Sequence, residues 1–428
     1  MARSIPGPAW LCRLRARAAE RFAATAWPTE ADEDWRYGRV DTLDLAEFEP
    51  VVVRPETNPP ARAAAPGDLL SGLASPAALV RTLDGFVVVT EPGPGAASSG
   101  LSVASALGRR RPPAAYGSVV AAAEDAFTLL AAGFGPDAVL IAVPAGVHVA
   151  GPIVVVHEVR ARSGRVAVFP RTFVELGAGA RATVVEHFVS EGAALVCPVT
   201  ELEVASGAEL AYHSIQEFGR SVWQLGYLAS RVGPAGSLRS FTAAFGCDYA
   251  RLCTHSTLDG EAASSELLAA YFADGTQVQD MRTFQEHAAP RTRSSLIFKG
   301  AVDDSARSVY SGLIHIHKGA RKSDAAQTNR NLVLSDGAHA DSVPNLDIEE
   351  NDVRCSHASA VGPIDRAQRF YLESRGVPPE VAERLILLGF FDDLFARAPE
   401  PGVAAYLRGV VAERLSPADA ARAREGSP

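Results

Sequence analysis

The runs Ala182-Thr-Val-Val-Glu186 and Glu201-Leu-Glu-Val204 are short and rich in β-forming residues, and a Gly-Ala pair lies near each, at Gly179 and Gly207. Similar runs continue from residue 139 to residue 357, with further Gly turn signals at loose intervals of about 18 to 29 residues. No helical pattern of crossover length separates the runs, so a doubly wound α/β fold is not favoured. The pattern predicts a stacked solenoid, in which each coil of ~20–30 residues buries its inward face against its neighbours. An antiparallel sandwich stays open, because periodicity alone does not separate parallel stacking from hairpins.

The region before the solenoid begins with a helical pattern. Apolar residues at spacings of three and four predict an amphipathic helix over residues 8–22, which ends before Trp27. The acidic and aromatic segment 32–37 predicts a surface turn whose Trp35 and Tyr37 pack against the body. Residues 55–116 are rich in Ala, Pro, Gly and Ser and predict long loops with short strand-like runs.

Helical patterns return after residue 357. They predict one helix that ends at Gly376, a second that opens at Pro378-Pro379, and a third over residues 403–415. The apolar stripe expected on the second helix consists of Val381, Leu385, Leu388 and Phe391. Their apolar faces fit internal packing or the docking of a partner. We therefore expect three parts, listed here by their limits: an N-terminal region with an amphipathic helix and loops (1–138), a β-helix core (139–360) and a C-terminal helical domain (361–428).

Composition excludes several classes of function. The chain has 428 residues, 47% of them hydrophobic, which is enough for two or three folded domains. Its net charge of -9 gives no support for binding nucleic acid or an anionic membrane. Five cysteines without a C-x-x-C pair argue against a disulfide framework and fit a reducing cytosol. Neither a signal sequence nor an apolar run of membrane-spanning length is apparent, so a cytoplasmic location is expected.

Motifs for the common catalytic sites are absent from the sequence. It contains no G-x-x-x-x-G-K-[ST], no G-x-S-x-G, no H-E-x-x-H and no G-x-G-x-x-G that opens a helix after a strand. The chain therefore has no recognisable nucleotide-hydrolysing loop, and any ATP would have to be hydrolysed by another chain.

Cys355 and His357 lie two residues apart where the β-rich pattern gives way to helices. In an extended strand such residues share one face and lie about 6.5–7 Å apart, so a thiolate and an imidazole would face one partner surface. Iron–sulfur clusters and structural zinc sites usually have four protein ligands. A metal site here would therefore be shared with a second chain. The alternative is that Cys355 is a small buried hydrophobe and His357 a hydrogen-bonded histidine.

Three other groups contain residue types that can form metal or thiol sites. His315 and His317 lie two apart on an expected strand, but no carboxylate stands in obvious register, so a polar outer face is favoured over metal binding. The acidic run 349–352 lacks the spacing of a calcium loop and predicts a solvated turn. Cys247 and Cys253 lie six residues apart and are expected in the core.

Six segments share their motifs with a known protein family: 322–335, 344–348, 352–357 and 370–376, together with 8–11 and 32–37 near the N-terminus. They resemble the SufB/SufD family of the SUF iron–sulfur cluster assembly machinery. The Cys-Ser-His signature is similar to that of the SufD branch of the family. One departure is Ala358, where the family usually has Gly after the His.

This resemblance implies a right-handed parallel β-helix flanked by helical regions. It further implies a non-catalytic scaffold that pairs with SufB and binds the SufC ATPase through the C-terminal helical domain, with no nucleotide bound by this chain. A nascent iron–sulfur cluster would form at the SufB–SufD interface. Cys355 and His357 match the family's interfacial positions, with His357 the stronger candidate for an iron or cluster ligand.

Two alternatives belong to other classes. A secreted-type β-helix carbohydrate-active enzyme would share the architecture, since fold does not fix function, but it should show secretion and a carboxylate or calcium constellation. A purely structural, partner-binding solenoid would not need Cys355 or His357.

Overall fold

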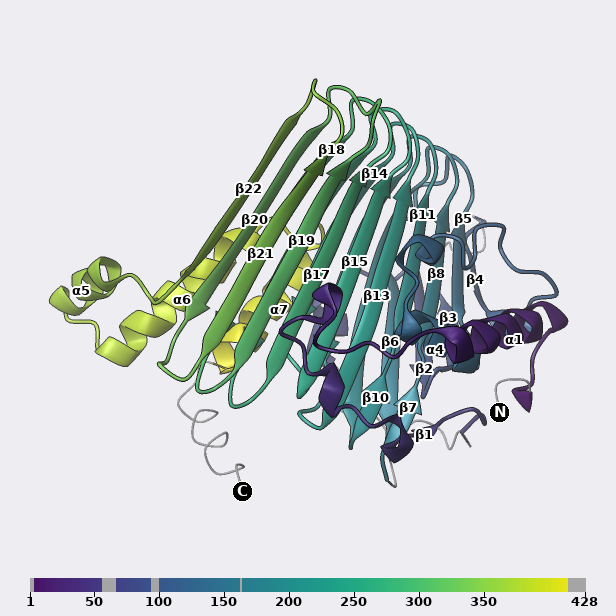
Figure 1. Ribbon diagram of the computed structural model, residues 1–428, viewed down its shortest axis with the longest axis horizontal. Coiled ribbons are helices and arrows are strands. Elements are labelled where there is room, and N and C mark those ends of the chain that lie inside the picture. The colour runs from purple at the N-terminus through teal and green to yellow at the C-terminus, as the bar shows by residue number, and fades with distance from the viewer. Residues whose placement is uncertain (1–3, 56–66, 94–99, 162–163, 415–428) are drawn as a thin grey trace.

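Two long β-sheets form the body of the protein in the computed structural model, which describes residues 4–55, 67–93, 100–161 and 164–414 (Figure 1). Sheet A contains β1 (Glu49–Pro50), β4 (Ser102–Ser105), β5 (Val139–Val143), β7 (Val166–Val168), β8 (Arg171–Leu176), β10 (Ala194–Val196), β11 (Val199–Val204), β13 (Val222–Val232), β15 (Tyr249–Leu258), β17 (Val278–His287), β19 (Arg307–Ile316) and β21 (His339–Ile348). Sheet B contains β2 (Ala78–Leu83), β3 (Phe86–Pro92), β6 (Ile153–Arg160), β9 (Arg181–Glu191), β12 (Glu209–Glu217), β14 (Ser237–Ala244), β16 (Ser264–Ala273), β18 (Arg293–Val302), β20 (Asp324–Val333) and β22 (Arg354–Gly362).

From β11 onward, consecutive strands alternate between the two sheets, as a coiling chain requires. Sheet A runs in the order β21-β19-β17-β15-β13-β11-β8-β5-β4, and sheet B in the order β22-β20-β18-β16-β14-β12-β9-β6-β2-β3. From β5 onward the pairings along these orders are parallel. The protein is therefore mainly β and forms a solenoid of about eight coils, which confirms the predicted fold and removes the antiparallel sandwich.

The length of a coil follows from the strand register. Arg181 lies beside Glu209, and Glu209 lies beside Ser237, so these coils each take 28 residues. Gly179 and Gly207 stand two residues before their strands with φ of 66° and 65°, the left-handed conformation that glycine adopts most easily. The Gly-Ala pairs near these two strands therefore mark real corners of the solenoid.

Inward-facing side chains of both sheets fill the interior of the solenoid. They alternate along each strand with outward-facing ones, as the pleat requires. The largest buried members of this inner layer are aromatic, and the smaller ones are mostly β-branched or Leu, including Val155, Val184, Leu210, Tyr212, Tyr271 and Tyr310.

Helices cover the outer faces of the sheets. The helices are α1 (Ala9–Ala24), α2 (Gly67–Gly72), α4 (Ala126–Phe134), α5 (Arg366–Ser374), α6 (Pro379–Phe395) and α7 (Pro401–Arg414), with short 3-10 turns η2 (Glu33–Trp35), η3 (Val40–Thr42), η4 (Leu45–Glu47), η5 (Ala106–Gly108) and η6 (Val120–Ala123). Apolar residues of α1 and α4 share a cluster with sheet A, and those of α2, α6 and α7 share one with sheet B. Figure 1 shows α5 projecting from the body beside the last coil. No helix in the described part of the chain is both long and apolar enough to span a membrane.

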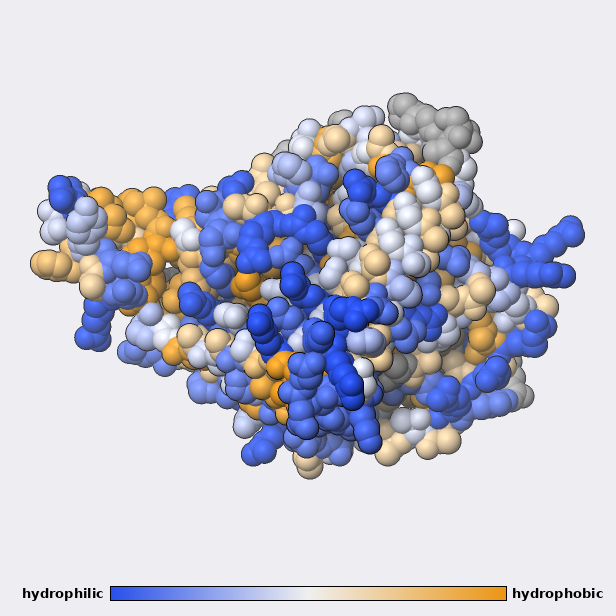
Figure 2. All heavy atoms as spheres, turned by 90° about the horizontal axis from the view of Figure 1, so that it is seen from above, coloured by the Kyte–Doolittle hydropathy of each residue, from blue (hydrophilic) through white to orange (hydrophobic). Residues whose placement is uncertain are grey.

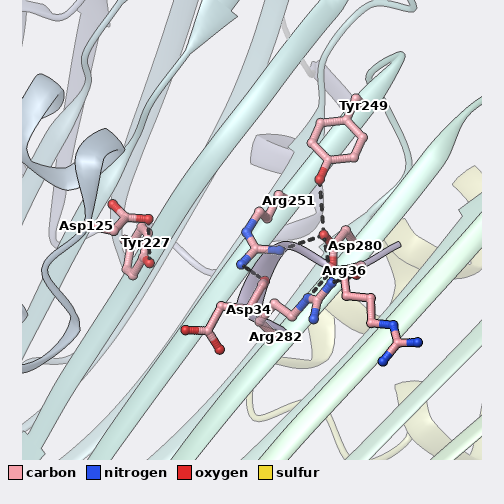
Figure 3. Close-up of polar contacts among 8 residues, drawn as sticks. All are labelled: Asp34, Arg36, Asp125, Tyr227, Tyr249, Arg251, Asp280 and Arg282. Carbon is pink, nitrogen blue, oxygen red and sulfur yellow. Dashed lines mark hydrogen bonds and ion pairs between the residues drawn. The ribbon is translucent and has the colours of Figure 1, made fainter. Parts of the chain in front are cut away.

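A buried ionic cluster anchors the N-terminal segment over residues 32–37 to sheet A (Figure 3). The Asp280 carboxylate lies 2.8 Å from Arg251 Nη1 and 2.6 Å from Arg282 Nε. Burial opposes ionisation of Asp280, but the two guanidinium groups outweigh it and lower the pKa of that carboxyl. Both arginines also donate to main-chain carbonyls of the segment, at Asp34 and Arg36.

The predicted surface turn over residues 32–37 is present. Trp35 is buried, with its ring 3.9 Å from the Arg251 guanidinium carbon, while Tyr37 is half-buried. The sheets also extend into the region that we expected to hold loops, because β2 pairs with β6 and β4 pairs with β5.

The helices near both ends of the chain begin and end close to the residues predicted from the sequence. The helix expected over residues 8–22 is α1, and Gly376, with φ of 86°, follows α5. The stripe predicted for the second C-terminal helix is wrong in part. Val381 and Leu385 are exposed, whereas Phe391 is buried against sheet B as expected, together with Leu387 and Phe395.

Candidate functional site

The solenoid ends in two strands that each have a partner on only one side. Within the described residues, β21 pairs only with β19 and β22 only with β20. Each therefore leaves a row of main-chain N–H and C=O groups that another strand could pair with. We call this surface, formed by β21 and β22, the open end.

Cys355 and His357 lie on the inward face of β22. In the register, Cys355 stands beside Ala325 and His357 beside Gln327, and both β20 side chains are buried inside the solenoid. Residues in register on parallel strands face the same side of the sheet. Cys355 and His357 therefore continue an interior column, but no further coil in the described part of the chain covers them, and His357 is exposed while Cys355 is half-buried.

The thiol of Cys355 contacts an apolar cluster at the end of the interior. This cluster includes Ile314, Ile316 and Ala325, with Val353 packed beside them. Partial burial raises the pKa of the Cys355 thiol, although a hydrogen bond from the Ser356 main chain opposes the change. The thiol is therefore protonated at neutral pH until a cation or a metal ion stabilises the thiolate.

A chain of polar side chains leads inward from the open end. Ser359 Oγ donates to Ser342 Oγ at 2.7 Å, which links β22 to β21 across the interior. Ser342 Oγ donates in turn to Asn329 Oδ1 at 2.8 Å, and Asn329 Nδ2 donates to the Tyr271 hydroxyl at 2.9 Å. The interior behind the candidate site is therefore hydrogen-bonded and ordered.

Gln327 is a further residue that sequence reasoning did not single out. It is the register partner of His357, its side chain is buried, and neither atom of its amide group has a hydrogen-bond partner in the part of the chain that the structure describes. The only signal in the sequence was its position inside the polar run 322–335. A buried amide without partners carries a free-energy cost, so a group that entered beside His357 could relieve it.

Apolar side chains complete the open end. Leu346 and Ile348 of β21 stand beside Ile314 and Ile316, so they face the interior, yet they are 36% and 42% exposed. Val361 of β22 is 45% exposed. Solenoids normally cover such a terminal layer with a polar cap, and an uncovered one favours association.

A second exposed apolar patch lies on the C-terminal helices. α5 buries none of its residues, and Phe370 and Tyr371 are 70% and 58% exposed. Val381 and Leu385 of α6 are exposed as well, and an ion pair between Arg369 and Glu383 joins the two helices. Figure 2 shows hydrophobic surface at the end of the molecule that carries α5 and α6.

Two other groups from the sequence lie where they were expected. Cys247 and Cys253 are buried in the body, and burial raises the pKa of both thiols. In the acidic run 349–352, Glu350 accepts main-chain hydrogen bonds from Gly319 and Asn351 and so closes a turn. Neither group belongs to a cluster of three metal-ligating side chains among the described residues.

Comparison with known proteins identifies the family of this architecture. The family model described as "SUF system FeS cluster assembly, SufBD core domain" matches residues 159–390, more than half of the chain. An iron–sulfur cluster assembly SufBD family protein of Mycobacterium tuberculosis is 35% identical over 245 residues, which cover 55% of this chain and 61% of the relative. The iron–sulfur cluster assembly protein SufD of Escherichia coli is 27% identical over 407 residues, 92% of this chain and 91% of the relative, and that of Bacillus subtilis is 29% identical over 300 residues, 68% and 67%. The chain belongs to the SufBD family of iron–sulfur cluster assembly proteins, which confirms the resemblance seen in its motifs.

Proposed function

We propose that this protein is the SufD-type scaffold subunit of a SUF complex, without catalytic activity of its own. The observation that carries the proposal is the open end, where the last interior layer of the solenoid is uncovered. The similarity to the E. coli SufD protein over 92% of the chain supports it, as do the matching motifs around Cys355 and His357. The family match gives no support to the carbohydrate-active alternative.

The partner at the open end is a SufB-type chain. A second β-solenoid could continue the two sheets by pairing with the free edges of β21 and β22. Its first coil would cover Leu346 and Ile348, and it would remove their exposed apolar area from water. Leu346 and Ile348 are thus apolar residues that the isolated chain exposes and that such a partner would bury.

A nascent iron–sulfur cluster is the cargo of this interface. Cys355 and His357 supply one soft and one borderline ligand from this chain, and the partner supplies the remaining ligands. His357 is the stronger candidate, because its exposed imidazole can reach a partner without displacing protein atoms. Cys355 would bind after iron displaces its proton, since a metal ion stabilises the thiolate.

The exposed patch on α5 and α6 is our proposed docking surface for a SufC-type ATPase. Phe370 and Tyr371 offer two aromatic anchors on a helix that has no buried residue in the described part of the chain. Because α5 directly follows β22, a movement imposed on α5 by ATP binding or hydrolysis could open or close the interface at the open end.

Co-purification tests the pairing directly. The chain is co-expressed with the SufB-type and SufC-type proteins of its own genome, as wild type and as Ile348→Glu. A charge at this uncovered interior position should lower the amount of SufB recovered by roughly tenfold or more, since burying an unpaired carboxylate is costly. Val53→Glu is the matched control, because Val53 is 76% exposed, lies far along the chain from the open end and should change nothing. Pairing that is unaffected by Ile348→Glu would place the partner elsewhere.

A further inference from the structure

The outer face of sheet A carries a histidine and carboxylate cluster that lies apart from Cys355 and His357. Glu286 of β17 stands in register with His315 of β19, and His317 follows two residues later on the same side. The expectation that no carboxylate stands in register with His315 is therefore wrong. The partner lies 29 residues earlier in the chain, one coil away, so only the register reveals it.

The three side chains bring their ligand atoms together. One carboxylate oxygen of Glu286 and one ring nitrogen from each of His315 and His317 all lie within 4.8 Å of one another. The two imidazole rings are 4.0 Å apart between centroids. All three residues are half-buried, so their side chains are partly shielded from water but still free to adjust.

His315 Nε2 is a buried atom without a hydrogen-bond partner in the described residues. Its nearest carboxylate oxygens are Asp347 Oδ2 at 3.7 Å and Glu349 Oε1 at 3.9 Å, too far for hydrogen bonds. Two ligands that each bind zinc at 2.0–2.1 Å in a tetrahedral site lie roughly 3.4 Å apart. The separations of 3.7 and 3.9 Å between His315 Nε2 and these two carboxylate oxygens are therefore closer to those of atoms that share an ion than to those of hydrogen-bonded atoms.

Glu286 is held in place and ionised. Thr257 Oγ1 donates to Glu286 Oε2 at 3.2 Å, and His255 Nε2 lies 3.3 Å from the same oxygen. The neighbouring His255 imidazole is the main cause that lowers the pKa of Glu286 to about 2, against the opposing effect of burial. Both contacts use Oε2, so Oε1 makes no hydrogen bond within the part of the chain described here. One oxygen is oriented and the other is available to a ligand.

We propose that Glu286, His315 and His317 bind a divalent first-row transition metal ion, such as Zn²⁺ or Fe²⁺. Two imidazoles and one carboxylate are the protein ligands of open zinc sites and of non-haem ferrous sites, whereas Mg²⁺ and Ca²⁺ prefer oxygen ligands throughout. Water, or the carboxylate of Asp347, would take a further position. Asp347 and Glu349 also add negative charge that favours a cation at this place.

This site is independent of the proposed cluster interface. Along β19 the side chains alternate, so His315 faces outward while Ile314 and Ile316 face inward, in the apolar cluster that also contacts Cys355. The metal site thus lies on the outer face of sheet A, whereas Cys355 and His357 lie on the inner face of sheet B. Metal binding by Glu286 and the two histidines needs no partner chain.

The test is metal titration of the purified, full-length, metal-free chain. Calorimetry with Zn²⁺ and optical absorption with Co²⁺ should report one ion per chain, in the tetrahedral or five-coordinate range for Co²⁺, and Mg²⁺ should not compete. The His315→Ala/His317→Ala variant and Glu286→Gln should each weaken binding roughly tenfold or more. The circular dichroism and melting temperature of each metal-free variant establish that it is folded.

Two control variants distinguish this site from other potential metal-binding residues of the chain. His339→Ala should leave binding unchanged, because His339 faces Asp341 in a similar pair on β21 but belongs to no three-ligand group among the described residues. Cys355→Ser/His357→Ala should also keep the site. The proposal is wrong if the wild type binds neither Zn²⁺ nor Co²⁺, or if folded His315→Ala/His317→Ala binds them with unchanged affinity. Loss of binding in Cys355→Ser/His357→Ala would likewise overturn it, because the ion would then belong to the open end.

Discussion

His213 and His357 show how strongly the burial of two histidines can differ within one chain. It lies on β12 beneath the C-terminal helices, stacks on Phe241, and neither ring nitrogen has a hydrogen-bond partner in the described part of the chain. Burial, and to a lesser extent the Arg239 cation, lower the pKa of His213 to about 3. His357, by contrast, is exposed at the open end. The sequence alone did not distinguish these environments, because both histidines lie on β-rich runs.

The state of His213 predicts a pH dependence of stability. In the unfolded chain this imidazole titrates near 6.5, so below that pH the unfolded state binds a proton that the folded state does not. Stability is therefore fully present above pH 6.5 and declines as the pH falls toward 3. By pH 4.5 the loss should be on the order of 2–3 kcal/mol for one fully buried histidine.

His213→Leu should remove part of this acid sensitivity. The substitution keeps an apolar side chain of similar size against Phe241 and abandons no hydrogen bond, so stability at pH 7 should be equal or higher. The melting temperature measured at pH 7 and at pH 4.5 gives the comparison. An equal fall in wild type and variant would show that His213 is not the group that titrates, and His287, whose pKa burial lowers to about 4, would be the next to substitute.

At the scale of elements, the corners of the solenoid explain why the repeat looked loose in the sequence. Seven corners, each two residues before a strand of sheet B, adopt a positive φ: Gly151, Gly179, Gly207, Ala235, Ala262, Arg291 and Lys322. The conformation repeats with the coil, but glycine occupies only the first three positions. A search for glycine therefore finds the early corners and misses the later ones, where alanine or a basic residue accepts the strain.

Gly207→Ala tests the cost of a corner. A Cβ at this position would meet no atom within 4 Å, so the effect comes from the backbone alone. The free energy of unfolding should fall by about 1–2 kcal/mol, measured by urea unfolding.

Gly389→Ala is the matched control, because Gly389 also has open space around it but lies inside α6. That variant should gain about 0.5–1 kcal/mol. Equal effects of the two substitutions would contradict the conformational explanation.

Element type and limits were predictable where local chemistry decides them. The β-rich run at residues 139–143 has the same first and last residue as strand β5. Pro378 and Pro379 lie at the start of α6, a position that proline favours. The buried face of α6 was not predictable, because apolar residues surround that helix on more than one side. Which side packs is decided by sheet B, whose position depends on residues more than a hundred places earlier in the chain.

At the scale of the whole molecule, the candidate sites depend on which coils meet and which stay uncovered. Cys355 and His357 were identified from the sequence, and their placement on one inward face agrees with an extended strand. The pairing of Glu286 with His315, and of Gln327 with His357, depends on strand register between coils, which spacing in a single sequence does not determine. The open end itself becomes visible only when the last coil is seen to lack a cover.

In the function proposed above, this chain supplies half of a shared cluster site through His357. The most direct measurement is anaerobic reconstitution with iron, a sulfide source and the SufB-type and SufC-type partners, followed by iron and sulfide quantitation. Clusters should form on the complex and not on the isolated chain. His357→Ala should reduce them severalfold or more, while Ser356→Ala, its exposed neighbour on β22, should have little effect. A cluster on the isolated chain, or full cluster content in a complex that carries His357→Ala, would show that His357 does not supply part of a shared site.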